Sequence, residues 1–165
     1  MLCQVQQQRK KTSVMIKWIE TGEEDRPRIP LKMTMQRFLM VADELGIDES
    51  ELLKEIVATA SINYKLGRLL WSAVDYGQQK TKTVVFKTDE EFVDWMWEKM
   101  HSITNEDVEG LEQDDIIKKL EKIPAMRVLQ AVIDDLTVYY NKLSSRAEKN
   151  VEASQQNQIA IGDHS

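Results

Sequence analysis

The sequence has few of the residues from which catalytic and metal sites are built. It contains one cysteine, Cys3, and two histidines, His101 and His164. Neither a disulfide within the chain nor a metal site with cysteine or histidine spacing can be assembled from these. The six glycines are scattered singly, which excludes a glycine-rich phosphate loop. We therefore expect a protein that is not an enzyme and that uses no cofactor or metal.

Long apolar runs are also absent. No run approaches the roughly 18 to 20 residues that cross a bilayer, and the first residues lack the apolar core of a signal peptide. A composition of 42% hydrophobic and 30% charged residues is typical of soluble globular proteins. At 165 residues the chain suits one domain. These features predict a cytoplasmic protein without a membrane partner.

Charge is distributed unevenly along the chain. The net charge is −6, but residues 1–40 carry eight basic and four acidic residues, a net of +4, so the remainder carries −10. Residues 89–135 alone hold fourteen acids against five basic residues, a net of −9. A basic N-terminal face could meet phosphate while the rest repels it. The acidic segment is either a solvated surface or a docking face for a basic partner.

Periodicity predicts one mainly helical domain over residues 13–147. Residues 1–12 have no usable pattern and are expected to form a flexible tail. Two short N-terminal strands are expected at 13–19 and 28–33, forming either a ribbon or a hairpin, and a further short strand near 81–87. The Gln/Asn/Ser-rich residues 148–165 are expected to be disordered.

Two helices are expected to meet at a corner between residues 34 and 56. Thr34 is placed to cap the first helix, and Gly46 suits the left-handed position that ends it. Asp48 and Glu51 form a box-like start for the second. The apolar pattern over 49–76 fits one helix, or two with a break near residues 61–63 or at Gly67.

Further helices are predicted after residues 88, 104, 113 and 124, where capping signals or a proline precede apolar stripes. In the helix that begins near residue 113 the stripe expected to be buried is Ile116, Ile117, Leu120 and Ile123.

The segment "RIPLKMTMQRFLMVADELGIDESELLKEIV" resembles the ribbon-helix-helix family of DNA-binding proteins. The resemblance covers residues 28–57, within a unit of 28–60, and it is carried by Phe38, Ala42, Leu45, Gly46, Ile47 and the run from Ser50 to Ile56. It implies a homodimer in which two strands pair into a ribbon that enters the major groove of duplex DNA. Such a regulatory protein would contact DNA through Arg28, Lys32 and Arg37.

Two alternatives stand beside the ribbon. Ala42 and Gly46 also have the spacing of a helix-turn-helix motif, and the same residues fit an ordinary helical corner. Three of the four residues Asp48 to Glu51 are acids, at the helix start where the family binds phosphate. Any reading of DNA would therefore depend on the basic strand.

A second basic section, residues 63–87, forms an auxiliary candidate surface. Aromatic residues alternate there with Lys65, Arg68, Lys80 and Lys82. Basic and aromatic residues together are typical of single-stranded nucleic-acid sites. The alternative is that the aromatics belong to the core and the basic side chains are solvated.

The rival to DNA binding is a non-catalytic helical adaptor or assembly protein. Trp95 falls on the apolar stripe of its helix, whereas Trp97 falls off it. An exposed tryptophan is a common interface anchor. We therefore expect a protein partner, if there is one, to contact Trp97 and the acidic helices.

Overall fold

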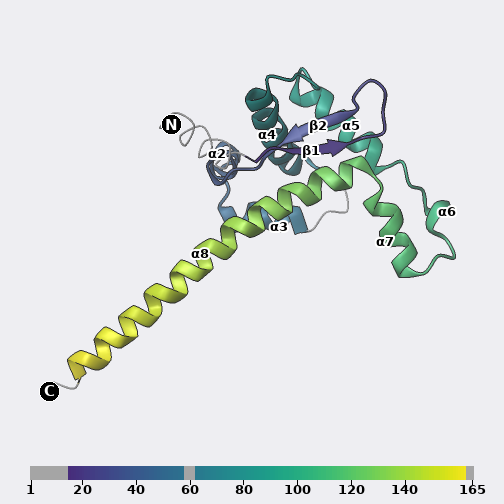
Figure 1. Ribbon diagram of the computed structural model, residues 1–165. Coiled ribbons are helices and arrows are strands. Elements are labelled where there is room, and N and C mark those ends of the chain that lie inside the picture. The colour runs from purple at the N-terminus through teal and green to yellow at the C-terminus, as the bar shows by residue number, and fades with distance from the viewer. Residues whose placement is uncertain (1–14, 58–61, 163–165) are drawn as a thin grey trace, which may run out of the picture.

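The computed structural model describes residues 15–57 and 62–162 (Figure 1), so the predicted tail 1–12 lies outside the described residues. It is mainly helical with an N-terminal hairpin, which confirms the predicted fold class. No helix within the described ranges is long and apolar enough to cross a membrane. The elements in chain order are β1 (Lys17–Glu20), β2 (Arg28–Leu31), α2 (Met35–Leu45), α3 (Glu49–Val57), α4 (Tyr64–Thr81), α5 (Asp89–Met100), α6 (Asn105–Val108), α7 (Gln113–Glu121) and α8 (Pro124–Gly162).

The two strands form an antiparallel hairpin within the chain. Ile19 of β1 lies opposite Ile29 of β2, and both are buried. Alternation along β2 places its apolar side chains in the core, which explains the period-two pattern of the sequence. Of the two arrangements left open for these strands, the structure has the hairpin.

Helix α4 covers the other edge of β2. The Lys32 N–H donates to the Ala73 carbonyl at 3.2 Å. Gly77 approaches so closely that a Cβ there would lie 2.4 Å from the Pro30 carbonyl oxygen. Proline has no N–H to offer a neighbouring strand, so it is tolerated at this edge. Because β1 and α4 occupy its two edges, β2 has no edge left for the strand of a second chain.

The predicted corner between α2 and α3 is confirmed. The Thr34 hydroxyl accepts the Arg37 N–H at 3.1 Å, and Gly46 has a φ of 66° at the end of α2. The Asp48 carboxylate accepts the Glu51 N–H at 2.9 Å. Local capping therefore determines both helix ends.

The segment 49–76 contains two helices rather than one. Helix α3 ends at Val57, and α4 begins after Asn63, whose side chain accepts the Leu66 N–H at 2.9 Å. Residues 58–61 lie outside the described ranges. Gly67 is inside α4, where it faces Val93 of α5.

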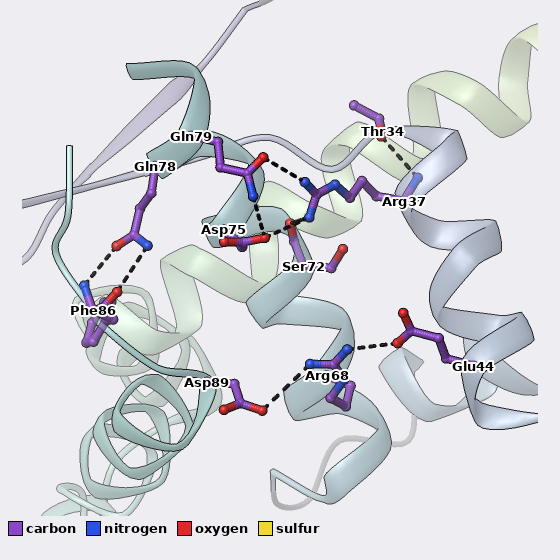
Figure 2. A network of polar contacts seen from close by, with 10 residues as sticks. All are labelled: Thr34, Arg37, Glu44, Arg68, Ser72, Asp75, Gln78, Gln79, Phe86 and Asp89. Atoms are coloured by element: carbon purple, nitrogen blue, oxygen red, sulfur yellow. Dashed lines mark hydrogen bonds and ion pairs between the residues drawn. The ribbon is translucent and has the colours of Figure 1, made fainter. Parts of the chain in front are cut away.

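The predicted strand at 81–87 is not present. Helix α4 continues to Thr81, and residues 82–88 form a loop. The Gln78 side chain takes the place of a neighbouring strand. Its Oε1 accepts the Phe86 N–H at 2.8 Å and its Nε2 donates to the Phe86 carbonyl at 3.1 Å (Figure 2). The Oε1 also accepts the Val85 N–H at 2.8 Å. One buried amide satisfies the backbone groups that a partner strand would have paired.

Helix α8 fixes the hairpin through a buried carboxylate. Asp135 is 4% exposed, and its Oδ1 lies 3.1 Å from the Lys17 Nζ and 3.4 Å from the Lys32 Nζ. Its Oδ2 accepts the Met33 N–H at 2.9 Å. A buried acid is stable only with such partners, and here they come from β1 and from the two residues that follow β2.

Helix α8 extends well past the rest of the fold (Figure 1). It continues to Gly162, so residues 148–162, which composition predicts to be disordered, are helical in the structure. No proline or glycine interrupts the chain between Ala125 and Ile161. The helix therefore meets no local signal that would end it.

Candidate interaction surfaces

The three predicted DNA-contacting residues occupy different environments. Arg28 is exposed, with its guanidinium 4.8 Å from the centre of the Trp18 ring. Lys32 is half-buried and paired with Asp135. The structure therefore does not place Arg28 and Lys32 on one free basic face.

Arg37 takes part in a polar network with helix α4 (Figure 2). Its Nη1 lies 3.0 Å from the Asp75 carboxylate, and its Nη2 donates to the Gln79 side chain at 3.2 Å. Gln79 in turn donates to Asp75 at 3.0 Å. A guanidinium with these partners must give them up before it can contact a phosphate.

Two of the four auxiliary cations are also paired. The Lys65 Nζ lies 3.5 Å from Glu55. Arg68 lies between Glu44 at 2.8 Å and Asp89 at 3.6 Å (Figure 2), and its hydrogen bond to Glu44 raises the pKa of the guanidinium. The N-terminal part of α4 thus offers little free positive charge.

Three basic residues that form no ion pair within the described ranges, Arg28, Lys82 and Lys87, lie around the loop that follows α4. Arg28 lines a surface hollow with Trp18 and Val84, and Lys82 and Lys87 line an adjoining hollow that shares Val84. None of the ion pairs between described residues involves these three cations. We call Trp18, Arg28, Lys82, Val84 and Lys87 the hairpin–loop patch.

Lys80 borders the hairpin–loop patch. Its Nζ lies 5.4 Å from the centre of the Tyr76 ring. Two acids, Asp25 and Asp75, also line the hollows of the patch. The patch is therefore basic and aromatic, but its positive charge is not continuous.

Trp97 is exposed and Trp95 is buried, as their positions on the helix predict. Trp97 is 55% exposed, and its ring stacks on the His101 ring with 4.2 Å between centroids. The Trp95 Nε1 donates to Glu23 at 3.0 Å. Within the described part of the chain, no group of three or more His, Cys, Asp or Glu side chains is placed to hold a metal ion.

An apolar groove separates α7 from α8. Ile117, predicted to be buried, is 44% exposed, and no residue of α7 is fully buried. Helix α7 leaves the predicted stripe open because α8 covers only part of it. The groove has a volume of about 400 Å³ and is lined by Ile117, Leu120, Glu121, Met126, Arg127 and Gln130. We call it the α7–α8 groove.

A second apolar groove lies between α3 and α8. Its volume is about 350 Å³, and its apolar lining is Leu53, Ile56, Ile133, Leu136 and Tyr140. We call it the α3–α8 groove. Sequence patterns marked several of these residues as apolar helix faces, but the pattern alone does not distinguish a covered face from an open one. Trp97 lines neither groove.

No family model, curated protein or solved structure matches this chain.

Proposed function

We propose that this protein is a non-catalytic protein-binding module of the adaptor or assembly class. Its α7–α8 groove receives a basic amphipathic helix of the partner. The observation that carries the proposal is the exposed Ile117, which lines an apolar groove within the most acidic segment of the chain. An amphipathic helix that lays its apolar face into a groove is a recurrent mode of recognition.

Charge favours a basic occupant. Glu121 and Arg127 both line the groove, so the lining itself carries one acid and one base. The excess of acid comes from its surroundings, where Asp114 lies on the same face of α7, three residues before Ile117. On α8, Asp134 is one turn from Gln130 and accepts its side-chain N–H at 2.8 Å. A Lys- or Arg-rich helix would meet these carboxylates while its apolar side chains fill the groove.

The ion pairs of the basic residues support this proposal over a DNA ribbon. Lys32 and Arg37 are paired within the chain, and the edges of β2 are occupied by β1 and α4. A ribbon shared by two chains would require β2 to leave at least one of these two neighbours. The protein-binding proposal requires no such rearrangement.

The test uses a fluorescein-labelled synthetic helix of leucine and lysine, with a leucine and glutamate helix as the charge control. Fluorescence anisotropy measures binding to the full chain. Ile117→Ser removes an exposed apolar contact worth about 1.5 kcal/mol, so we expect about tenfold weaker binding. Val84→Ser, at a position 73% exposed on another surface, is the matched control and leaves the affinity unchanged.

Two results contradict the proposal. One is equal binding of the basic peptide to the wild type and to Ile117→Ser. The other is equal binding of the basic and acidic peptides to the wild type. Far-UV circular dichroism of each variant checks that α7 remains helical.

A second candidate function is nucleic-acid binding on the hairpin–loop patch. It is favoured by the exposed Arg28, whose guanidinium lies over the Trp18 ring, and by Lys82 and Lys87 in the adjoining hollow. Labelled single-stranded and duplex DNA would bind more weakly at higher salt, and Arg28→Ala and Lys82→Ala would each reduce the salt dependence. Lys65→Ala, at a paired cation, is the control. Absence of any binding at low salt eliminates this candidate.

A further inference from the structure

The α3–α8 groove lies where α8 leaves the rest of the fold. Tyr140 lines the groove, makes an edge contact with Phe38 at 6.3 Å between ring centroids, and places its hydroxyl 3.4 Å from Glu49. The next residues, 141–145, are all exposed. The groove is therefore open beside the point at which α8 leaves the other described elements.

Among the elements that the structure describes, none lies beside the projecting part of α8 (Figure 1). The helix continues from residue 146 to Gly162. Helices of this length gain most of their stability from packing rather than from propensity. Leu143, two turns after the groove residue Leu136, is 47% exposed and continues the apolar face toward the projection.

We infer that α8 of a second copy of this chain fills the α3–α8 groove, with the two α8 helices antiparallel about a twofold axis. Each α8 forms one wall of a groove and also projects beyond the fold as an arm. In a twofold dimer the arm of each copy can therefore occupy the groove of the other. An antiparallel pairing of residues 133–162 sets the end of each arm against residues 133–141 of the other chain, the stretch of α8 that contains the groove residues.

The size of this contact is sufficient for a specific dimer. Residues 133–162 form a helix about 45 Å long, at 1.5 Å per residue. If about a third of the circumference of a helix 10 Å wide is covered, each copy buries about 450 Å². Helix α3 adds further area, so the total reaches about 1,000 Å², the lower limit for specific interfaces.

This inference does not depend on the proposed function. The α3–α8 groove shares no lining residue with the α7–α8 groove. Ile117→Ser should therefore leave self-association intact while it weakens peptide binding, and failure of one proposal leaves the other standing.

Analytical ultracentrifugation of the full chain tests the dimer, at concentrations up to about 200 µM. We expect a species of twice the 19.2 kDa chain mass. Thr137 is exposed and lines the groove, so Thr137→Arg places a charged side chain across its mouth. The dissociation constant should then rise about tenfold or more, as for the loss of one well-packed contact.

Val138→Arg is the matched control, because Val138 is the adjacent residue, is 52% exposed and does not line the groove. It should dimerise like the wild type. Asn141→Arg, one turn further along the groove, provides a second variant if Thr137→Arg perturbs the fold. A wild type that is monomeric at every concentration overturns the inference. Equal dissociation constants for the groove variants and Val138→Arg also overturn it.

Discussion

Replacing Gly77 by alanine tests the close packing of α4 on β2. A Cβ at residue 77 would lie 2.4 Å from the Pro30 carbonyl oxygen, 2.5 Å from the Pro30 carbonyl carbon and 2.7 Å from the Leu31 Cα. All three atoms belong to the backbone, so no side-chain rotation can relieve the contact. Ordinary van der Waals contact begins at 3.4 Å, so α4 and β2 would have to separate by about 1 Å.

Two opposing effects determine the expected change in the free energy of unfolding. Alanine in a helix interior gains about 1 kcal/mol over glycine. Overpacking a core typically costs about 1–3 kcal/mol, and a backbone clash belongs at or above the top of that range. We expect a net destabilisation of about 2 kcal/mol, equivalent to a fall in Tm of about 4–8 °C for a chain of this size.

Gly67→Ala is the matched control in the same helix. Its nearest neighbour is the Val93 Cγ2 at 3.0 Å, the end of a half-buried side chain that can move. The gain in helix propensity and the cost of moving Val93 should nearly cancel, so stability should change by less than about 1 kcal/mol.

Urea unfolding followed by tryptophan fluorescence and far-UV circular dichroism measures both variants. The reasoning fails if Gly77→Ala is as stable as Gly67→Ala. That result would mean that β2 does not lie against α4 in solution, and an edge of β2 would then be free for a second chain.

Two other substitutions test the polar contacts of the hairpin and its turn. Asp135→Ala leaves the buried Met33 N–H without its acceptor, while Lys17 and Lys32, whose side chains are 38% and 19% exposed, can be hydrated. The free energy of unfolding should fall by about 1–3 kcal/mol, and an unchanged stability would contradict the contact of α8 with the hairpin. Burial raises the pKa of Glu23, but hydrogen bonds, that from Lys99 foremost, outweigh burial and hold the pKa below its ordinary value. Because the pKa of Glu23 is lower in the folded state than in the unfolded state, the ionised carboxylate stabilises the fold above the unfolded-state pKa. This contribution is lost as the pH falls through the folded-state pKa. Thermal unfolding of Glu23→Gln should therefore depend less on pH than that of the wild type between about pH 5 and 3, and parallel profiles would contradict this.

The parts of the fold that sequence predicts correctly depend on contacts between near neighbours. The caps formed by Thr34 and Asp48 each join groups three residues apart, and Gly46 needs only its own backbone geometry. The separation of buried Trp95 from exposed Trp97 follows from helix periodicity alone. Such features can be read without knowledge of the tertiary fold.

The parts that sequence does not predict depend on distant partners. Nothing near residue 37 in the chain indicates that Arg37 will pair with Asp75, and nothing near residue 85 indicates that Gln78 will replace a partner strand. The open face of α7 is a further example. The apolar stripe that contains Ile117 has the same sequence pattern whether or not another helix covers it. The interaction surfaces could therefore be located only in the folded chain.

The Asp135 contacts affect the order in which the chain can fold during synthesis. The carboxylate that pairs with Lys32 lies 103 residues downstream of it. At a synthesis rate of about 5–20 residues per second, Lys32 is made about 5–20 s before its partner. Until α8 emerges from the ribosome, the lysines of the hairpin and the Met33 N–H must be hydrated. The hairpin of β1 and β2 therefore completes its packing only after α8 has been synthesised.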